Sequence, residues 1–92
     1  MIISIKYKAL KNYWTKGQSK GLNSKWLPKI DIILDALDAS TKADDMNLPG
    51  FYFHNLAGKD LGRYSVRLTG NWRITFQFNG EDAELLDMED YH

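Results

Sequence analysis

Apolar residues recur at helical spacing in two stretches of the first half of the chain. Leu10, Tyr13 and Trp14 follow the i, i+3, i+4 pattern of one face of a short helix. A longer stripe advances in steps of three and four and predicts a helix whose apolar face packs in the core. The stripe consists of Leu22, Trp26, Ile30, Ile33, Leu34 and Leu37. Ser24 is its expected N-cap, and Pro28 falls near the first turn, where a missing N–H is tolerated.

After residue 50 the apolar positions alternate, which is the pattern of strands with one buried face. Strands are predicted over residues 51–54, 64–68, 72–78 and 83–88. The pairs Gly70-Asn71 and Asn79-Gly80 suit two-residue hairpin turns between the last three strands. A β-branched-rich run at residues 2–5 predicts one more strand at the start of the chain.

These elements predict an α+β fold in which two N-terminal helices pack on one face of a four- or five-stranded, mostly antiparallel sheet. The chain has 92 residues, of which 43% are hydrophobic and 13% are aromatic. This length supports one hydrophobic core and leaves no room for a second, so we expect a single domain over residues 1–92.

The formal net charge is zero, but the two halves of the chain differ in sign. Residues 1–42 carry eight lysines and three aspartates, whereas residues 43–92 carry four basic and nine acidic residues. This polarity fits a polyanionic or charged protein partner, and it fits equally two halves that attract each other within one fold.

The composition argues against several classes of site. The chain has no cysteine, so disulfides, thiol nucleophiles and thiolate metal sites are excluded, and a reducing cytoplasm is the expected location. Two histidines are too few for a histidine-built metal centre. The sequence shows neither a secretory leader nor an apolar run long enough to span a membrane.

Arginines fall on the strand positions that point away from the predicted helices. Alternation places Arg63 and Arg67 opposite the apolar face of their strand, and Arg73 follows the same rule on the next strand. Guanidinium forks match phosphate oxygens, so this face could bind a phosphate backbone. The alternative is a set of solvated arginines that balance the acidic last strand.

Two further groups could carry acid–base chemistry. His54 is expected at the end of the strand over residues 51–54, and the sequence closes on Asp90, Tyr91 and His92. RNA cleavage needs a base for the 2′-hydroxyl and an acid for the leaving oxygen, and an aromatic ring can stack on a nucleobase. A surface histidine and a frayed terminal segment are the alternative interpretations.

Five segments, in their order and spacing, resemble the HigB branch of the RelE-like toxins, and the resemblance extends over residues 1–92. The matching segments are residues 45–50, 54–58, 64–67, 70–76 and 90–92. The strand Trp-Arg-Ile-Thr-Phe and the closing Asp-Tyr-His are its most specific parts.

The resemblance implies a ribosome-dependent endoribonuclease that cleaves mRNA, contacts ribosomal RNA and uses the 2′-hydroxyl of the RNA as nucleophile, without a metal or cofactor. It also implies a helix-turn-helix antitoxin of the HigA type as partner, with operator DNA reached only through that antitoxin. The matching catalytic positions are His54, Arg73, Asp90, Tyr91 and His92. The candidate substrate-binding residues are Arg63, Arg67 and Lys59.

Two departures from the family pattern keep other functions open. Relatives often carry lysine where this chain has Ala57, and they are commonly basic, whereas this chain has a calculated pI of about 6.7. The alternatives are a catalytically weak or inactive member that acts as an antitoxin-binding co-repressor, and an RNA- or ribosome-binding module that does not cleave. Growth arrest on expression separates the toxin from both.

Overall fold

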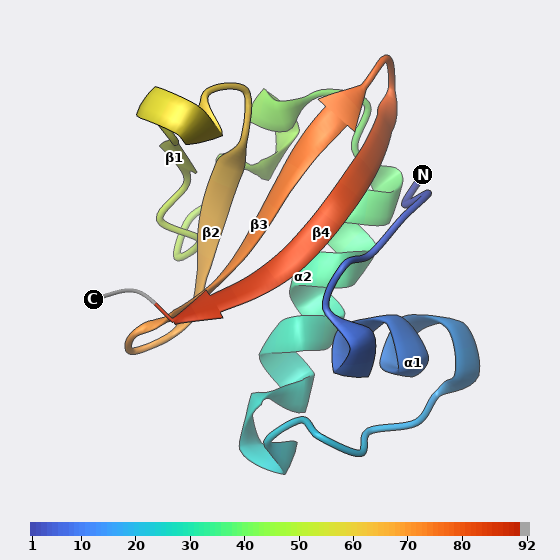
Figure 1. Ribbon diagram of the computed structural model, residues 1–92. Helices are drawn as coiled ribbons and strands as arrows, with labels where there is room; N and C mark the ends of the chain where they lie inside the picture. The colour runs from blue at the N-terminus through green and yellow to red at the C-terminus, as the bar shows by residue number, and fades with distance from the viewer. Residues whose placement is uncertain (91–92) are drawn as a thin grey trace.

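The computed structural model describes residues 1–90, and its helices and strands follow the expected order along the chain (Figure 1). The α-helices are α1 (Lys8–Lys16) and α2 (Leu27–Ala39), and the strands are β1 (His54–Asn55), β2 (Tyr64–Thr69), β3 (Trp72–Asn79) and β4 (Asp82–Asp90). Short 3₁₀ turns are found at Ser24–Trp26, Ala43–Met46 and Gly58–Asp60. None of the helices within residues 1–90 is long and apolar enough to cross a membrane.

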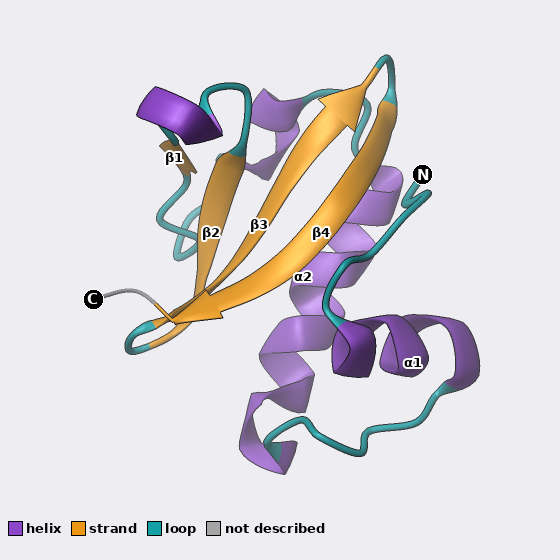
Figure 2. Ribbon diagram, in the orientation of Figure 1, coloured by secondary structure: helices purple, strands orange, loops and turns teal. Residues whose placement is uncertain are grey.

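The four strands form an antiparallel meander in the order β1-β2-β3-β4, with α1 and α2 gathered on one side (Figure 2). Gly70 and Asn71 make the β2–β3 turn, as predicted. The β3–β4 turn instead uses Gly80 and Glu81, one position later than predicted, because Asn79 still pairs with Asp82. The α+β arrangement of two helices on one face of an antiparallel sheet is confirmed.

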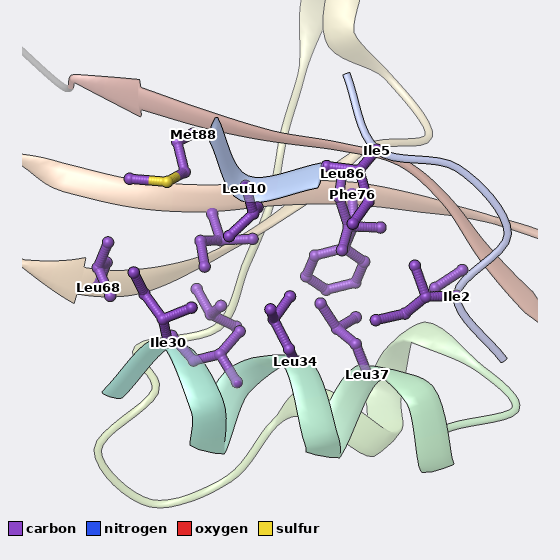
Figure 3. Close-up of a cluster of buried hydrophobic side chains, with 14 of the residues drawn as sticks. Ile2, Ile5, Leu10, Ile30, Leu34, Leu37, Leu68, Phe76, Leu86 and Met88 are labelled. Carbon is purple, nitrogen blue, oxygen red and sulfur yellow. The ribbon is translucent and has the colours of Figure 1, made fainter. Parts of the chain in front are cut away.

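The core lies between α2 and the sheet. Ile30, Leu34 and Leu37 point from one face of α2 toward the strands, where Phe76 and Leu86 meet them (Figure 3). All five side chains are at most 1% exposed. Truncating one of them, as in Leu34→Ala, removes buried area and leaves a cavity, at a cost of about 2–5 kcal/mol.

The start of α2 differs in detail from the sequence prediction. Ser24 was the expected N-cap, but it lies inside the 3₁₀ turn, and the Asn23 side chain accepts a hydrogen bond from the Lys25 N–H. Trp26 precedes α2 without a side-chain cap, and Pro28 lies in the first turn as expected. The 3₁₀ turn therefore displaces the cap by one residue.

The predicted N-terminal strand is formed only in part. Ile2 and Ile5 make isolated parallel bridges with Ala83 and Leu86 of β4. Between these two contacts β4 contains a bulge, because Thr75 pairs with Asp87 while Gln77 pairs with Glu84. The extra residue interrupts the ladder, so residues 2–5 run beside β4 without becoming a regular fifth strand.

The strand predicted over residues 51–54 is also shorter than expected, since β1 consists of His54 and Asn55. Tyr52 has a φ of 49°, which is incompatible with an extended strand, and the chain bends there. The Phe51 carbonyl nevertheless accepts a hydrogen bond of 2.8 Å from the Arg67 N–H, so the bend is attached to β2.

Candidate active site

A cavity of about 320 Å³ lies at the end of the sheet where the β2–β3 hairpin turns. Its lining comes from Tyr52 and residues 54–56, from Ser65 and Arg67 of β2, and from residues 70–73 of the hairpin. Three residues selected from the sequence, His54, Arg67 and Arg73, are thus brought together at one cavity from three different strands.

His54 reaches the cavity because β1 pairs with β2. Its Cα partner is Ser65, and the His54 side chain is exposed. Ser65 is opposite Thr75 in the next strand, so these residues form one row on the face turned away from the helices. An exposed imidazole beside a cavity can be reached by a substrate and can take part in proton transfer.

Arg67 and Arg73 occupy the adjacent row of the same face. They are direct Cα partners in the β2–β3 ladder, and the irregularity in this hairpin begins only after Arg67. Arg73 is half-buried and Arg67 is exposed. Two like charges in opposite positions of a ladder are unfavourable, and Glu89, the Cα partner of Arg73 on β4, adds an opposite charge to the same row.

Arg67 makes a second contact in the cavity wall. Its guanidinium carbon lies 4.3 Å from the centre of the Tyr52 ring. This distance is typical of a cation–π interaction, in which the guanidinium plane rests on the aromatic face. The sequence analysis did not identify Tyr52 as a site residue. Its position two residues before His54 could have indicated it, because alternate residues of a strand share a face.

Asp90 brings the end of β4 to the same region. It is the Cα partner of Trp72, which lines the cavity and packs on Trp26 with ring centroids 5.8 Å apart. Tyr91 and His92, which follow Asp90 in the sequence, lie outside the described residues. Their assignment to the site therefore remains a prediction.

Arg63 lies apart from the cavity lining and spans the outer face of the sheet. Its guanidinium donates hydrogen bonds to Gln77 Oε1 at 3.2 Å, to Thr75 Oγ1 at 3.0 Å and to the Leu85 carbonyl at 2.8 Å. The last acceptor is in the β4 bulge, whose Leu85 N–H binds Ser4 Oγ at 2.8 Å. This network links β2, β3 and β4 and gives Arg63 a structural position.

Lys59 and Ala57 lie in the connection between β1 and β2. Ala57 precedes the 3₁₀ turn Gly58–Asp60, which contains Lys59, and both side chains are exposed. Neither lines the cavity, although Leu56 beside them does. Within residues 1–90, the cations that line the cavity are therefore Arg67 and Arg73.

The arrangement suits chemistry on a phosphate ester. Two guanidinium groups can bind phosphate oxygens and stabilise charge that develops on them. His54 supplies a titratable group at the same cavity. Asn55 and Asn71 add amide donors and acceptors to the wall, which can form hydrogen bonds with a nucleobase or ribose.

Comparison with known proteins gives a family match over almost the whole chain. The family described as “RelE-like toxin of type II toxin-antitoxin system HigB” matches residues 3–92. The protein “Endoribonuclease HigB” of Proteus vulgaris is 39% identical over 92 residues, covering 100% of both chains.

Solved structures with the same fold include other toxins. A chain of the YoeB–YefM complex from Staphylococcus aureus superposes with a TM-score of 0.66 at 18% identity, covering 100% of this chain and 98% of that chain. A copper-bound mutant toxin from Helicobacter pylori gives a TM-score of 0.57 at 16% identity, covering 98% and 93% respectively. At these identities the likeness concerns the fold.

Proposed function

This chain belongs to the HigB family of RelE-like toxins of type II toxin–antitoxin systems, and from this premise we propose that it is an endoribonuclease that cleaves mRNA on the ribosome. The observation that carries the proposal is the convergence of His54, Arg67 and Arg73 on one cavity. Cleavage there would stop translation, which makes the chain the toxic member of its pair.

In the proposed reaction the RNA supplies its own nucleophile. The 2′-oxygen attacks the adjacent phosphorus, the bond to the 5′-oxygen breaks, and a 2′,3′-cyclic phosphate forms. A base removes the 2′-hydroxyl proton and an acid protonates the leaving 5′-oxygen. We assign these proton transfers to His54, Asp90 and His92.

The remaining site residues act on charge and on position. Arg73, together with Arg67, stabilises the negative charge that builds up on the phosphate oxygens in the transition state. Tyr91 is assigned a stacking role against a base of the mRNA. The scheme needs only protein side chains and the RNA.

The partners follow from the family and from the charge distribution. The chain belongs to a toxin–antitoxin family, so an antitoxin is its protein partner, and we propose one of the helix-turn-helix HigA type that brings the complex to operator DNA. The seven lysines between Lys6 and Lys29 are proposed to contact ribosomal RNA. Because the proposed substrate is mRNA on ribosomes, we propose that the protein acts in the cytoplasm.

The test is induced expression followed by mapping of mRNA ends. Wild-type protein should arrest growth, and primer extension should show new 5′ ends inside translated regions. His54→Ala should remove both effects while antitoxin binding persists, which shows that the fold is retained. The exposed Glu81, in the β3–β4 turn and outside the cavity lining, provides Glu81→Ala as a surface control for general effects of substitution.

The two alternative functions predict different results. An inactive co-repressor would bind antitoxin, and a non-cleaving module would bind RNA or the ribosome. Neither would cause growth arrest or new mRNA ends. Ala57, where relatives often have lysine, is the residue that favours reduced activity. Cleavage by the wild-type chain excludes both alternatives.

A further inference from the structure

Tyr52 has a backbone conformation and an exposure that core packing does not explain. Its φ of 49° lies in the left-handed region, which a bulky residue other than glycine rarely adopts. Its side chain is 58% exposed although it is a large aromatic ring. Backbone strain of this kind clusters at active sites and ligand clamps.

The bend that contains Tyr52 is attached to β2 through the residue that its ring contacts. The Arg67 N–H donates a 2.8 Å hydrogen bond to the Phe51 carbonyl, immediately before Tyr52. The Arg67 guanidinium carbon lies 4.3 Å from the Tyr52 ring centre. The backbone and the side chain of Arg67 therefore both position the Tyr52 ring, so Tyr52 and Arg67 are already paired without a ligand.

Both members of the pair line the cavity that also contains His54 and Arg73. An aromatic ring joined to a guanidinium plane offers a flat surface of the kind on which unpaired RNA bases stack. The exposed edges of the guanidinium remain suited to phosphate oxygens. The pair thus combines a surface for a base with a charge for the backbone next to it.

We propose that Tyr52 and Arg67 form a nucleobase-stacking subsite that holds a base of single-stranded RNA next to the scissile phosphate. This inference rests on the proposed function and adds to it a residue that determines how the substrate is positioned. The ligand is an unpaired RNA base, which stacks on the pair while Arg67 also attracts the adjoining phosphate. Stacking accepts every base, so the subsite contributes affinity and alignment.

The experiment measures binding separately from cleavage. Short single-stranded oligoribonucleotides with 2′-O-methyl groups lack the nucleophilic hydroxyl, so they bind without being cut. A labelled hexanucleotide is titrated with the full chain and followed by fluorescence anisotropy. A matched series places one abasic residue at each position in turn, which removes a base and keeps the phosphate backbone.

Two substitutions at Tyr52 separate the ring from its apolar bulk. Tyr52→Leu should weaken binding of the intact hexanucleotide about tenfold, as expected for loss of one stacked base. Tyr52→Phe keeps the ring and should recover most of that loss. At one position the abasic residue should cost the wild type the same factor but cost Tyr52→Leu nothing further, because both changes remove the same contact.

Three results would overturn the subsite. The first is equal affinity of Tyr52→Leu and the wild type for the hexanucleotide. The second is that the affinity loss from Tyr52→Leu adds to the loss from the abasic residue at every position. The third is that the folded wild type does not bind the hexanucleotide. Urea unfolding of each variant confirms that it is folded. If the chain cleaves mRNA and any of these results is obtained, the subsite is refuted and the proposed function stands. If the chain binds RNA in a base-dependent way but does not cleave it, the proposed function is refuted and the subsite stands.

Discussion

Arg67 and Arg73 are directly opposite each other across the β2–β3 ladder, on the face of the sheet turned away from the helices. Opposite positions with like charge destabilise a sheet unless something compensates them. Glu89, the Cα partner of Arg73 on β4, adds a carboxylate to the same row. Both arginines also line a cavity with His54, where we propose that they bind a phosphate of the substrate. The β2–β3 register therefore places both arginines at the proposed phosphate-binding site.

Replacing Arg73 tests its role on the phosphate. Arg73→Ala should lower the rate of ribosome-dependent mRNA cleavage about a hundredfold, the effect of losing one electrostatic stabiliser of the transition state. Folding should be nearly intact because the side chain lies off the core face. The rate is measured in single-turnover reactions on programmed ribosomes, with ribosome binding as the control. An unchanged rate in a variant that still binds would refute the assignment.

Arg63 should affect stability more than catalysis. Arg63→Ala removes three hydrogen bonds and leaves the fully buried Thr75 hydroxyl without its guanidinium donor, so we expect a loss of about 1–3 kcal/mol in the free energy of unfolding. Urea denaturation measures this loss. The folded fraction should cleave at a rate near that of the wild type. A stable variant with a large catalytic defect would instead place Arg63 in the substrate site.

The lysines of the first half should make ribosome binding sensitive to salt. Affinity should fall steeply between about 50 and 200 mM salt, because counterions are released when lysines meet RNA phosphates. Reversing the charge at Lys8 and Lys20, which line a second cavity beside α1, should weaken binding without changing the chemical step. Affinity that does not vary with salt would mean that the charge polarity acts only within the protein.

His92 is predicted to act in proton transfer. His92→Ala should abolish growth arrest and cleavage, and a bulky tag fused after His92 should at least weaken both, while a tag before Met1 is tolerated better. An imidazole can serve as the acid or the base of the proposed proton transfers. Antitoxin binding reports on the fold. Wild-type cleavage by a folded His92→Ala protein would remove this residue from the mechanism.

Asp45 should contribute to the dependence of stability on acid. Its carboxylate accepts hydrogen bonds from the Thr41 N–H at 3.0 Å and the Thr41 hydroxyl at 3.4 Å, and the backbone hydrogen bond from Thr41 lowers the pKa of Asp45 below its ordinary value of 3.8. The stabilisation is complete above pH 3.8 and is lost as pH falls through the lowered pKa.

Asp45→Asn should therefore reduce stability at neutral pH, and its difference from the wild type should shrink as pH falls below 3.8. Urea denaturation at a series of pH values measures the difference. The exposed Asp44, beside it in the same 3₁₀ turn, supplies Asp44→Asn as a matched control. A difference that stays constant with pH would show that the hydrogen bonds of Asp45 do not depend on its charge.

Local periodicity was sufficient to predict the helices, the last three strands and, along β2 and β3, the side of the sheet on which each side chain lies. Alternation along β2 and β3 placed Arg67 and Arg73 on the outer face, because successive strand residues point to opposite sides wherever the strand packs. Helical spacing likewise selected Ile30, Leu34 and Leu37 as the core face of α2. Such patterns depend on residues that are close in sequence, so they can be recognised without the tertiary structure.

Contacts between distant segments decided which outer-face residues meet. Arg63 and Arg67 are equivalent by alternation, yet the β4 bulge at Leu85 provides a carbonyl that binds Arg63, while the bend at Tyr52 brings an aromatic ring to Arg67. Bulges and left-handed residues arise where the packing of the whole chain outweighs local preference. The sequence therefore determined the face of each arginine, and only the tertiary structure divided them between the sheet and the cavity.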